Sequence, residues 1–363
     1  MNRLFFMNHA PVQAYFTKNS NDFVVNEIPL YEFSNDGEHL VLHVRKKDLT
    51  TWQMLQIFSE TSGAKIRDFG YAGLKDKDGM TTQYISIHKS HEKAFRDFTH
   101  QNIKILNSIY HNNKIKMGHL KGNRFFIRLK KVLPIDAFKI KEAFERVSKE
   151  GYPNYFGYQR FGKDGNNFNE GRAILLNEKR ERNKKLRDFL ISAYQSELFN
   201  QWLSKRVEIS RYFESFNEKE LQSILSWDKN SIKEIKRQPQ FFKILRGDVC
   251  HHYPHGKAFI CENIEAEVGR FNAKDITVTG LLAGGKTARA CGLAGEIETS
   301  SFKEAEIFLD KLDGTRRFAW NFIENPEFNY KEEDAWVELA FTLTKGAYAT
   351  VVLEEILHKE IIK

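Results

Sequence analysis

The chain has 363 residues, of which 41% are hydrophobic and 29% charged, a composition that excludes a disordered protein and predicts two or three folded domains. Lys and Arg outnumber Asp and Glu by 56 to 48, and the net charge of +8 favours polyanionic partners without requiring them. No apolar run approaches the roughly 20 residues of a membrane span. The three cysteines, with no Cys-x-x-Cys pair, indicate neither a disulfide framework nor a zinc site, so we expect a cytoplasmic protein without metal.

The first elements along the chain are expected to be short strands. Apolar and β-branched residues at 23–25 and 40–44 are separated by the turn residues Ser34–Gly37, a pattern that predicts a hairpin. Thr50 or Thr51 has the side chain of a helix N-cap and precedes an apolar stripe at helical spacing. The sequence therefore predicts a helix directly after the second strand.

The next elements mix strands and helices. Alternating polar and apolar residues predict a strand over 84–88, which leaves Gly73–Gln83 as a connecting segment. A further strand is expected over 123–130, followed by a helix that opens at Pro134. The regular alternation of a doubly wound fold is missing, so we expect the α+β class.

The second half begins at a charged run over residues 177–187, which is typical of a linker or an exposed helix face and could mark a domain edge. Residues 190–206 have a helical pattern. Short strands and turns are predicted over 247–261 and 276–280, and a strand and a helix over 337–343 and 347–358.

A basic strip lies between Phe98 and Ile135, where no acidic residue occurs. Any single Lys is usually a solvated surface residue, but eight cations without one acid favour a phosphate-binding surface at least as much. RNA is therefore the leading candidate partner. The strip consists of Lys104, Lys114, Lys116, Lys121, Arg124, Arg128, Lys130 and Lys131.

The segment Gly73–Gly79 holds two carboxylates, Asp76 and Asp78, between lysines and glycines that permit a tight backbone path. Charge alternation of this kind is common in loops, so composition alone favours a charged turn. A carboxylate flanked by cations stays ionised, however, and is then able to act as a nucleophile or a base. No hydrolase, zinc-protease or cysteine motif supplies a rival nucleophile.

A second motif points to a different chemistry. Gly280–Thr287 satisfies the Walker A pattern and follows the β-like run 276–279, which on its own indicates a nucleoside triphosphatase. A P-loop needs a helix that begins at Lys286 and Thr287 and a later strand that ends in a magnesium-binding Asp. Neither is well supported by the residues that follow, so we rank the motif as a coincidence.

The stretch Gly73-Leu74-Lys75-Asp76, continuing through Thr81 and Gln83, resembles the signature of the TruD family of pseudouridine synthases. Other stretches resemble the same family in the same order, namely Asp22–Val25, Gly37–His39, Gly118–Asn123, Gly151–Gly162, Ser192–Asn200, Gly247–Val249 and Lys345–Thr350. The resemblance covers nearly the whole chain and is weakest over residues 208–243. Small departures from the family pattern occur at Gly79, Thr344 and Tyr348.

The resemblance implies an α+β, two-domain pseudouridine synthase. Residues 1–177 and 323–363 would form a catalytic domain with a mixed or antiparallel sheet, and residues 178–322 an inserted family-specific domain. It further implies that a uridine of tRNA, expected at position 13, is isomerised to pseudouridine without a cofactor. The expected partner is tRNA, no obligatory protein partner is indicated, and the oligomeric state stays open.

The family's catalytic Asp corresponds to Asp76, which would attack ribose C1′ or abstract a ribose proton; the sequence does not choose between these routes. The resemblance makes four residues substrate-binding candidates, with rings on the base or ribose and an amide on a polar edge: Phe23, Asn154, Phe156 and Tyr348. Supporting roles or RNA contacts are expected of Lys75, Arg160, Lys121 and Arg124. The alternatives are a P-loop protein and a non-catalytic RNA-binding protein.

Overall fold

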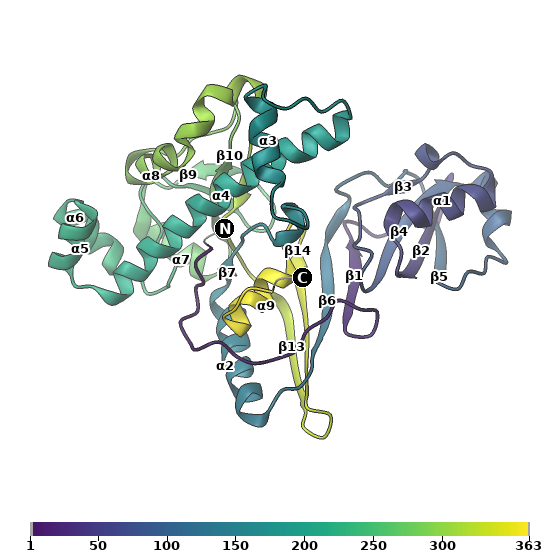
Figure 1. The fold of residues 1–363 in the computed structure, drawn as a ribbon, viewed down its shortest axis with the longest axis horizontal. Coiled ribbons are helices and arrows are strands. Elements are labelled where there is room, and N and C mark those ends of the chain that lie inside the picture. The colour runs from purple at the N-terminus through teal and green to yellow at the C-terminus, as the bar shows by residue number, and fades with distance from the viewer. Residues whose placement is uncertain (1–2, 362–363) are drawn as a thin grey trace. The chain divides into compact units, whose positions relative to one another are not determined.

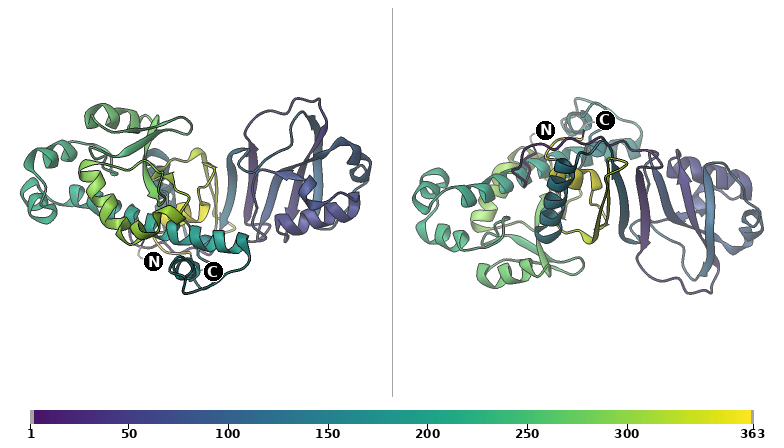
Figure 2. Two further views of the ribbon diagram at one scale, coloured as in Figure 1. Left: turned by 90° about the horizontal axis from the view of Figure 1, so that it is seen from above. Right: turned by 90° about the horizontal axis from the view of Figure 1, so that it is seen from below.

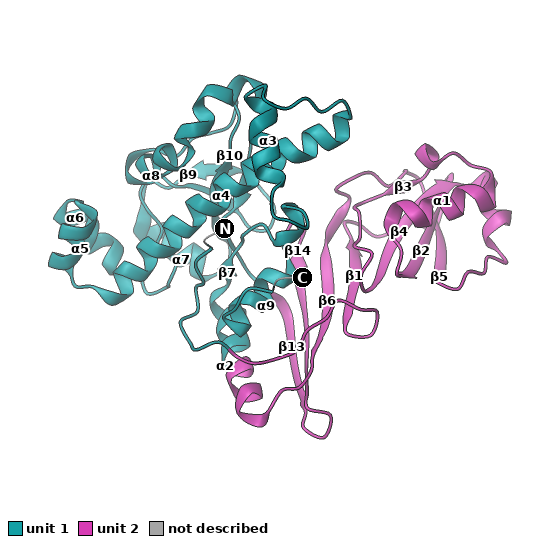
Figure 3. Ribbon diagram, in the orientation of Figure 1, with its two compact units in different colours: residues 1–11, 142–322, 347–363 teal, residues 12–141, 323–346 magenta. Residues whose placement is uncertain are grey.

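The computed structural model describes residues 3–361 and divides the chain into two compact units (Figure 3). Unit 1 consists of residues 1–11, 142–322 and 347–363, and unit 2 of residues 12–141 and 323–346. This division differs from the predicted domains, because residues 142–177 fall in the same unit as residues 178–322. Compactness does not identify a catalytic or an inserted domain, so the boundaries 1–177, 178–322 and 323–363 stay a prediction.

A mixed eight-stranded sheet forms the body of unit 2 (Figure 1). The strand order is β13-β14-β6-β1-β4-β2-β5, with β3 paired to β4; β1 and β4 run parallel, and the other pairs are antiparallel. The strands are β1 (Phe23–Pro29), β2 (His39–Lys47), β3 (Gly70–Tyr71), β4 (Met80–His88), β5 (Ile103–His111), β6 (Leu120–Leu129), β13 (Glu324–Lys331) and β14 (Trp336–Thr344). With helices on the same chain, the sheet confirms the α+β class.

The strands predicted over 23–25, 40–44, 84–88 and 123–130 are present, but the predicted hairpin between the first two is wrong. Strand β1 pairs with β4 and β6, and β4 separates it from β2. The turn itself exists: Gly37 has φ +126° and lies so close to the His111 backbone that a Cβ would be 2.5 Å away. Turn residues encode a change of direction, whereas the strand's neighbour is decided by long-range pairing.

Helix α1 (Thr51–Ser62) lies along one face of β2, β4 and β5 (Figures 1 and 2). Its N-cap is Thr50, one of the two predicted residues; Thr50 Oγ1 accepts the Gln53 N–H at 3.1 Å, and Gln53 Oε1 accepts the Thr50 N–H at 2.9 Å. The apolar side of α1, with Leu55 and Phe58, is fully buried. This core supports β4, the strand that directly follows the Asp76 segment.

Unit 1 is mainly helical and contains a four-stranded sheet of order β11-β10-β8-β9 and a β12-β7 pair. Helix α2 (Pro134–Glu150) begins in unit 2 and ends in unit 1. The strands are β7 (Tyr152–Pro153), β8 (Val249–His252), β9 (Ala258–Ile260), β10 (Ile276–Leu282), β11 (Thr315–Phe318) and β12 (Trp320–Asn321). The helices are α3 (Asn167–Leu175), α4 (Lys184–Ser215), α5 (Glu218–Leu225), α6 (Lys229–Lys236), α7 (Ile264–Asn272), α8 (Gly292–Phe302) and α9 (Ala349–Leu357).

The P-loop interpretation is wrong. Strand β10 already contains Gly280, its neighbours β8 and β11 are both antiparallel, and the next helix, α8, begins at Gly292 instead of Lys286. Gly280 has a packing role: a Cβ there would lie 2.2 Å from the Trp202 ring and 2.7 Å from the Phe199 ring of α4. The glycine therefore permits the close approach of β10 to α4 and does not cradle a phosphate.

The buried carboxylate of Glu355 on α9 binds backbone groups of the N-terminal segment of unit 1. Glu355 is 1% exposed and accepts the backbone N–H groups of Phe6 and Met7 at 2.9 and 3.1 Å. Burial raises the pKa of Glu355 to about 8, although the two N–H groups and Arg211 oppose the shift and Glu354 adds to it. The folded protein thus keeps a proton that the unfolded chain releases near pH 4.5.

We expect this carboxyl group to make the protein less stable as pH rises from about 4.5 to about 8, because the folded state holds more protons than the unfolded state in that window. Glu355→Gln should remove this contribution. The free energy of unfolding of the variant minus that of the wild type should rise by on the order of 4 kcal/mol from pH 5 to pH 8.5, measured by denaturant titration at both pH values. Glu262→Gln, at an exposed position, is the matched control. The same pH trend in both variants would contradict the assignment of this pH dependence to Glu355.

Candidate functional site

Asp76 lies in the loop between β3 and β4 of unit 2, with a side chain that is 55% exposed. The nearest cation is Lys18, whose Nζ lies 3.4 Å from Asp76 Oδ2 and whose own side chain is 11% exposed. The predicted connecting segment is shorter than expected, because β4 begins at Met80 and includes Thr81 and Gln83. The carboxylate is therefore open to a ligand, with the Lys18 ammonium group beside it.

The backbone around Asp76 is anchored on both sides. The N–H of Lys75 donates to Thr51 Oγ1 at 2.9 Å, and that hydroxyl donates to Gln83 Oε1 at 3.0 Å. On the other side, Lys46 Nζ donates to the carbonyl oxygen of Asp76 at 2.8 Å and to that of Leu49 at 2.6 Å. Lys46 is 1% exposed, and its burial lowers its pKa to about 8, an effect that Asp76 opposes. These contacts fix the loop that carries the carboxylate.

Lys75 points away from solvent. Its Nζ lies 2.6 Å from Glu27 Oε2 and donates to Asn123 Oδ1 at 2.9 Å, with side chains that are 7% exposed for Lys75 and 1% for Glu27. Glu27 also accepts the Tyr84 N–H at 3.1 Å. The Lys75 ammonium group thus pairs with Glu27 and not with Asp76, and both the supporting and the RNA-contact role of Lys75 stay predictions.

Phe23 lies beside the Asp76 loop because β1 and β4 run parallel, with Val24 opposite Met80. Phe23 is 4% exposed, and Lys18 Nζ lies 5.4 Å from the centroid of its ring. Lys18 therefore contacts both the candidate catalytic carboxylate and the candidate substrate-binding ring. The structure brings Phe23 and Asp76 into one cluster of unit 2.

Gly79 is the residue that permits this arrangement. It has φ +103°, and a Cβ there would lie 2.8 Å from Phe23 O and 2.9 Å from Phe23 Cδ1. We expect Gly79→Ala to lower the free energy of unfolding by about 1–3 kcal/mol, because it adds backbone strain and a clash. Denaturant titration measures this cost. Gly73→Ala is the control in the same loop, since its Cβ would meet nothing within 4 Å; equal stability of the two variants would contradict the prediction.

The other predicted substrate-binding residues lie together in unit 1, around Arg317 of β11. Arg317 Nη2 donates to Asn154 Oδ1 at 3.0 Å, and Arg317 Nε donates to Asn154 O at 3.1 Å. Asn154 is 4% exposed and donates through Nδ2 to Phe318 O at 3.0 Å. In this conformation both ends of the Asn154 amide bind protein groups, so the amide orients the guanidinium.

Rings enclose the same guanidinium. Arg317 Cζ lies 4.0 Å from the centroid of Phe156, within cation–π distance, and 5.9 Å from that of Tyr348. The Phe156 and Tyr348 centroids are 6.2 Å apart in an edge-on arrangement. Phe156 is buried and Tyr348, directly before α9, is half-buried. Burial lowers the pKa of Arg317 to about 10, so the group remains a cation at neutral pH.

Arg160 belongs to the edge of this cluster. Its Cζ lies 5.8 Å from the Phe156 centroid, and its guanidinium donates to the hydroxyl groups of Ser192 and Ser196 on α4. Burial lowers the pKa of Arg160. The predicted phosphate contact of Arg160 stays a prediction. Its guanidinium lies within cation–π distance of Phe156.

The basic strip is not one uninterrupted cationic surface. Arg124 pairs with Glu327 at 2.7 Å, Arg128 with Glu338 at 2.9 Å, and Lys130 with Asp22 at 2.6 Å. These acids lie far away in the sequence and reach β6 through the sheet pairing. Lys121 is exposed. RNA contacts by Lys121 and Arg124 stay predictions.

Sequence reasoning missed Lys18, Lys46, Glu27 and Arg317. The first three act on the Asp76 loop from distant segments and carry no motif of their own. Arg317 is one of two adjacent arginines, and strand alternation separates them: Arg316 pairs with Glu298 at 2.7 Å, while Arg317 contacts Asn154. The Arg-Arg pair was the available signal, but the sequence offered no partner for it.

Comparisons with known proteins agree with one another. A family model described as tRNA pseudouridine synthase D (TruD) matches residues 2–182 and 219–356. A protein named tRNA pseudouridine synthase D from Campylobacter jejuni subsp. jejuni (strain 81-176) is 55% identical over 99% of this chain and 97% of its own. One of the same name from Helicobacter pylori (strain 26695) is 48% identical over 97% of this chain and 95% of its own.

The fold has a counterpart among solved structures. A chain from Methanosarcina mazei, provisionally named tRNA pseudouridine synthase D, superposes with a TM-score of 0.64 and covers 98% of this chain and 96% of its own. At 20% identity this likeness concerns the fold alone. Over residues 3–361, no helix is long and apolar enough to cross a membrane.

Proposed function

Because the chain belongs to the TruD family of tRNA pseudouridine synthases, we propose that it isomerises a uridine of tRNA to pseudouridine, with Asp76 as the catalytic carboxylate and without a cofactor. The observation that carries the assignment of Asp76 is its exposed carboxylate on a loop whose backbone is fixed by Lys46 and Thr51. Position 13 of the tRNA is our proposed target.

The reaction breaks the bond between uridine N1 and ribose C1′ and joins C5 to C1′; the hydrogen of C5 leaves to solvent as a proton, and N1 takes up a proton. An ionised Asp76 supplies the electron pair, either to C1′ as a nucleophile or to a ribose proton as a base. Lys18, 3.4 Å away, positions this carboxylate. No step requires an oxidant, a reductant or a metal ion.

We assign Phe23 and the unit 1 cluster to substrate binding. Rings hold an unstacked base through their faces, and a guanidinium is able to donate to the oxygen atoms of uracil. Phe156 and Tyr348 flank Arg317, and Asn154 fixes its orientation. Arg317 is thus a fifth binding candidate beside the four that the sequence supplied. A cytoplasmic location follows from the proposed substrate and stays a proposal, as do the domain boundaries.

The test is incubation of the purified protein with unmodified tRNA transcripts in the absence of any added cofactor, followed by mapping of pseudouridine. We expect product at one uridine of tRNA. A protein that binds tRNA but forms no product with any transcript would be the non-catalytic RNA-binding protein, and the proposed function would be wrong. Product at another position would overturn only the proposed target.

A further inference from the structure

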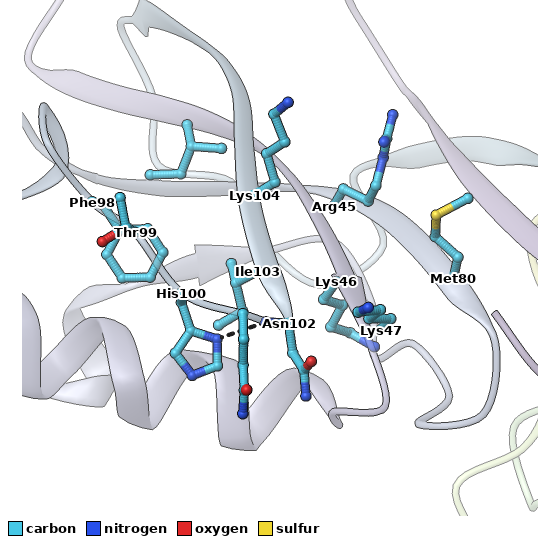
Figure 4. A pocket seen from close by; sticks show the side chains of 12 residues that line it. Arg45, Lys46, Lys47, Met80, Phe98, Thr99, His100, Asn102, Ile103 and Lys104 are labelled. Carbon is cyan, nitrogen blue, oxygen red and sulfur yellow. Dashed lines mark hydrogen bonds between the residues drawn. The ribbon is translucent and has the colours of Figure 1, made fainter.

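A pocket of about 450 Å³ lies in unit 2 where β2, β5 and the first residue of β4 meet (Figure 4). We call it the basic pocket, because its lining includes Arg45, Lys47, Lys104 and His100 and contains no Asp or Glu. Figure 4 shows Arg45 and Lys104 side by side and pointing the same way. The basic pocket is thus a concave site with cations and without a built-in counter-charge.

The sheet register forces these cations together. In the antiparallel β2–β5 pairing Arg45 is directly opposite Lys104, and Lys47 lies two residues further along β2, on the same face as Arg45. Like charges directly opposite each other destabilise a strand pair. An arrangement that costs stability and leaves cations at the surface indicates a ligand of opposite charge.

Other cations of the same sheet are neutralised by the protein itself. Arg124, Arg128 and Lys130 of β6 and its flank each pair with a carboxylate. By contrast, within residues 3–361 no carboxylate pairs with the exposed Arg45, Lys47 or Lys104. The contrast sets the basic pocket apart from an ordinary charged sheet surface.

A neutral donor completes the basic pocket. His100 Nδ1 accepts the N–H of Asn102 at 3.1 Å, the dashed line in Figure 4. A neutral imidazole that accepts at Nδ1 carries its hydrogen on Nε2. Nε2 is therefore able to donate to an anion even when the ring is uncharged.

The basic pocket adjoins the Asp76 loop. Lys46, between Arg45 and Lys47, also lines the pocket and donates to the Asp76 carbonyl oxygen at 2.8 Å. Met80, which lines the pocket, is opposite Lys47 in the β2–β4 register and begins the strand that follows the loop. An anion in the basic pocket would therefore bind beside β2, the strand whose Lys46 fixes the backbone of the candidate catalytic residue.

We propose that the basic pocket binds a phosphate group of the tRNA backbone and so holds the strand whose uridine is presented to Asp76. The proposal rests on the proposed function for the identity of the polyanion. Arg45 and Lys104 supply the charge, and a guanidinium suits the planar, two-point recognition of phosphate oxygens. Lys47 supplies a further donor, and His100 lies in the same lining.

The test compares Arg45→Gln/Lys104→Gln with Lys93→Gln/Lys139→Gln, a control that removes two exposed lysines of the same unit outside the pocket. The dissociation constant for unmodified tRNA is measured as a function of salt. We expect the pocket variant to bind about tenfold more weakly or worse, as for the loss of a charge-assisted hydrogen bond. Its plot of log Kd against log salt should become shallower by about 1. The control should match the wild type in both.

Thermal unfolding checks that the pocket variant is folded, and removal of the opposed charges should not lower its melting temperature. At saturating tRNA its kcat should stay near that of the wild type while its KM rises. Equal affinity and equal salt dependence of the two double variants would overturn the proposal that the basic pocket binds a tRNA phosphate. So would stabilisation of the wild type by inorganic phosphate with unchanged tRNA binding of the pocket variant, which would indicate a free-anion site. Absence of product from the wild type would instead overturn the proposed function. The two failures are distinguishable, because the binding measurement does not depend on turnover.

Discussion

Asp76→Asn is expected to lower the rate of pseudouridine formation by on the order of a thousandfold or more, as the loss of a nucleophile or base does in other enzymes. The amide keeps the size of the side chain but has no electron pair of comparable basicity. Because the carboxylate is 55% exposed and its loop is fixed through backbone atoms, the variant should fold and bind tRNA as the wild type does. Single-turnover assays with excess enzyme separate this chemical effect from binding.

Asp78→Asn is the matched control, since it makes the same substitution in the same loop two residues away. We expect its rate to stay within a few-fold of the wild type. If the two variants lost activity equally, the assignment of the reaction to one carboxylate would be wrong. An Asp76→Asn variant that stayed active would clear Asp76 of the catalytic role.

Arg317→Met is expected to have the second largest effect. The change removes the donors to Asn154 Oδ1 and to the backbone oxygens of Asn154 and Tyr155, and it removes the cation that lies 4.0 Å from the Phe156 centroid. The change also removes the proposed donor to uracil; losing one charge-assisted hydrogen bond to the substrate costs about 1.5–3 kcal/mol, so kcat/KM should fall by about 10- to 150-fold. Steady-state assays with tRNA measure the fall.

Arg317→Lys keeps the charge but not the planar fork, and we expect it to recover only part of the activity. Arg289→Met serves as a control for stability, because Arg289 pairs with Glu306 at the surface of the same unit. A purely structural role for Arg317 would lower the melting temperature and leave the kinetics of the folded fraction unchanged. That outcome would remove Arg317 from the binding cluster.

The local elements of unit 2 were predictable because their signals are local. The β-branched run at 23–25 and the N-cap Thr50 determine a strand and a helix through nearest neighbours, and both are present. The pairing partner of β1 was not predictable, since the choice of β4 over β2 depends on contacts that no short window contains.

The candidate site shows the same division. Asp76 stood out through its place in an ordered series of motifs, although its chemistry alone matched a charged turn. Lys18 and Arg317 were not predicted, because the role of a cation depends on the groups that it contacts and the sequence does not show those contacts. Likewise, three cations of the basic strip found carboxylate partners only through the sheet, at Glu327, Glu338 and Asp22.

The central claim, that Asp76 drives the exchange of the N1 bond for a C5 bond, has a direct measurement. Transcribed tRNA labelled with tritium at C5 of uridine releases its label only when C5 forms the new bond. In one assay without cofactor, the wild type and Asp78→Asn should release tritium, whereas Asp76→Asn should release none above background while still binding the tRNA. Release by Asp76→Asn at the wild-type rate would contradict the account.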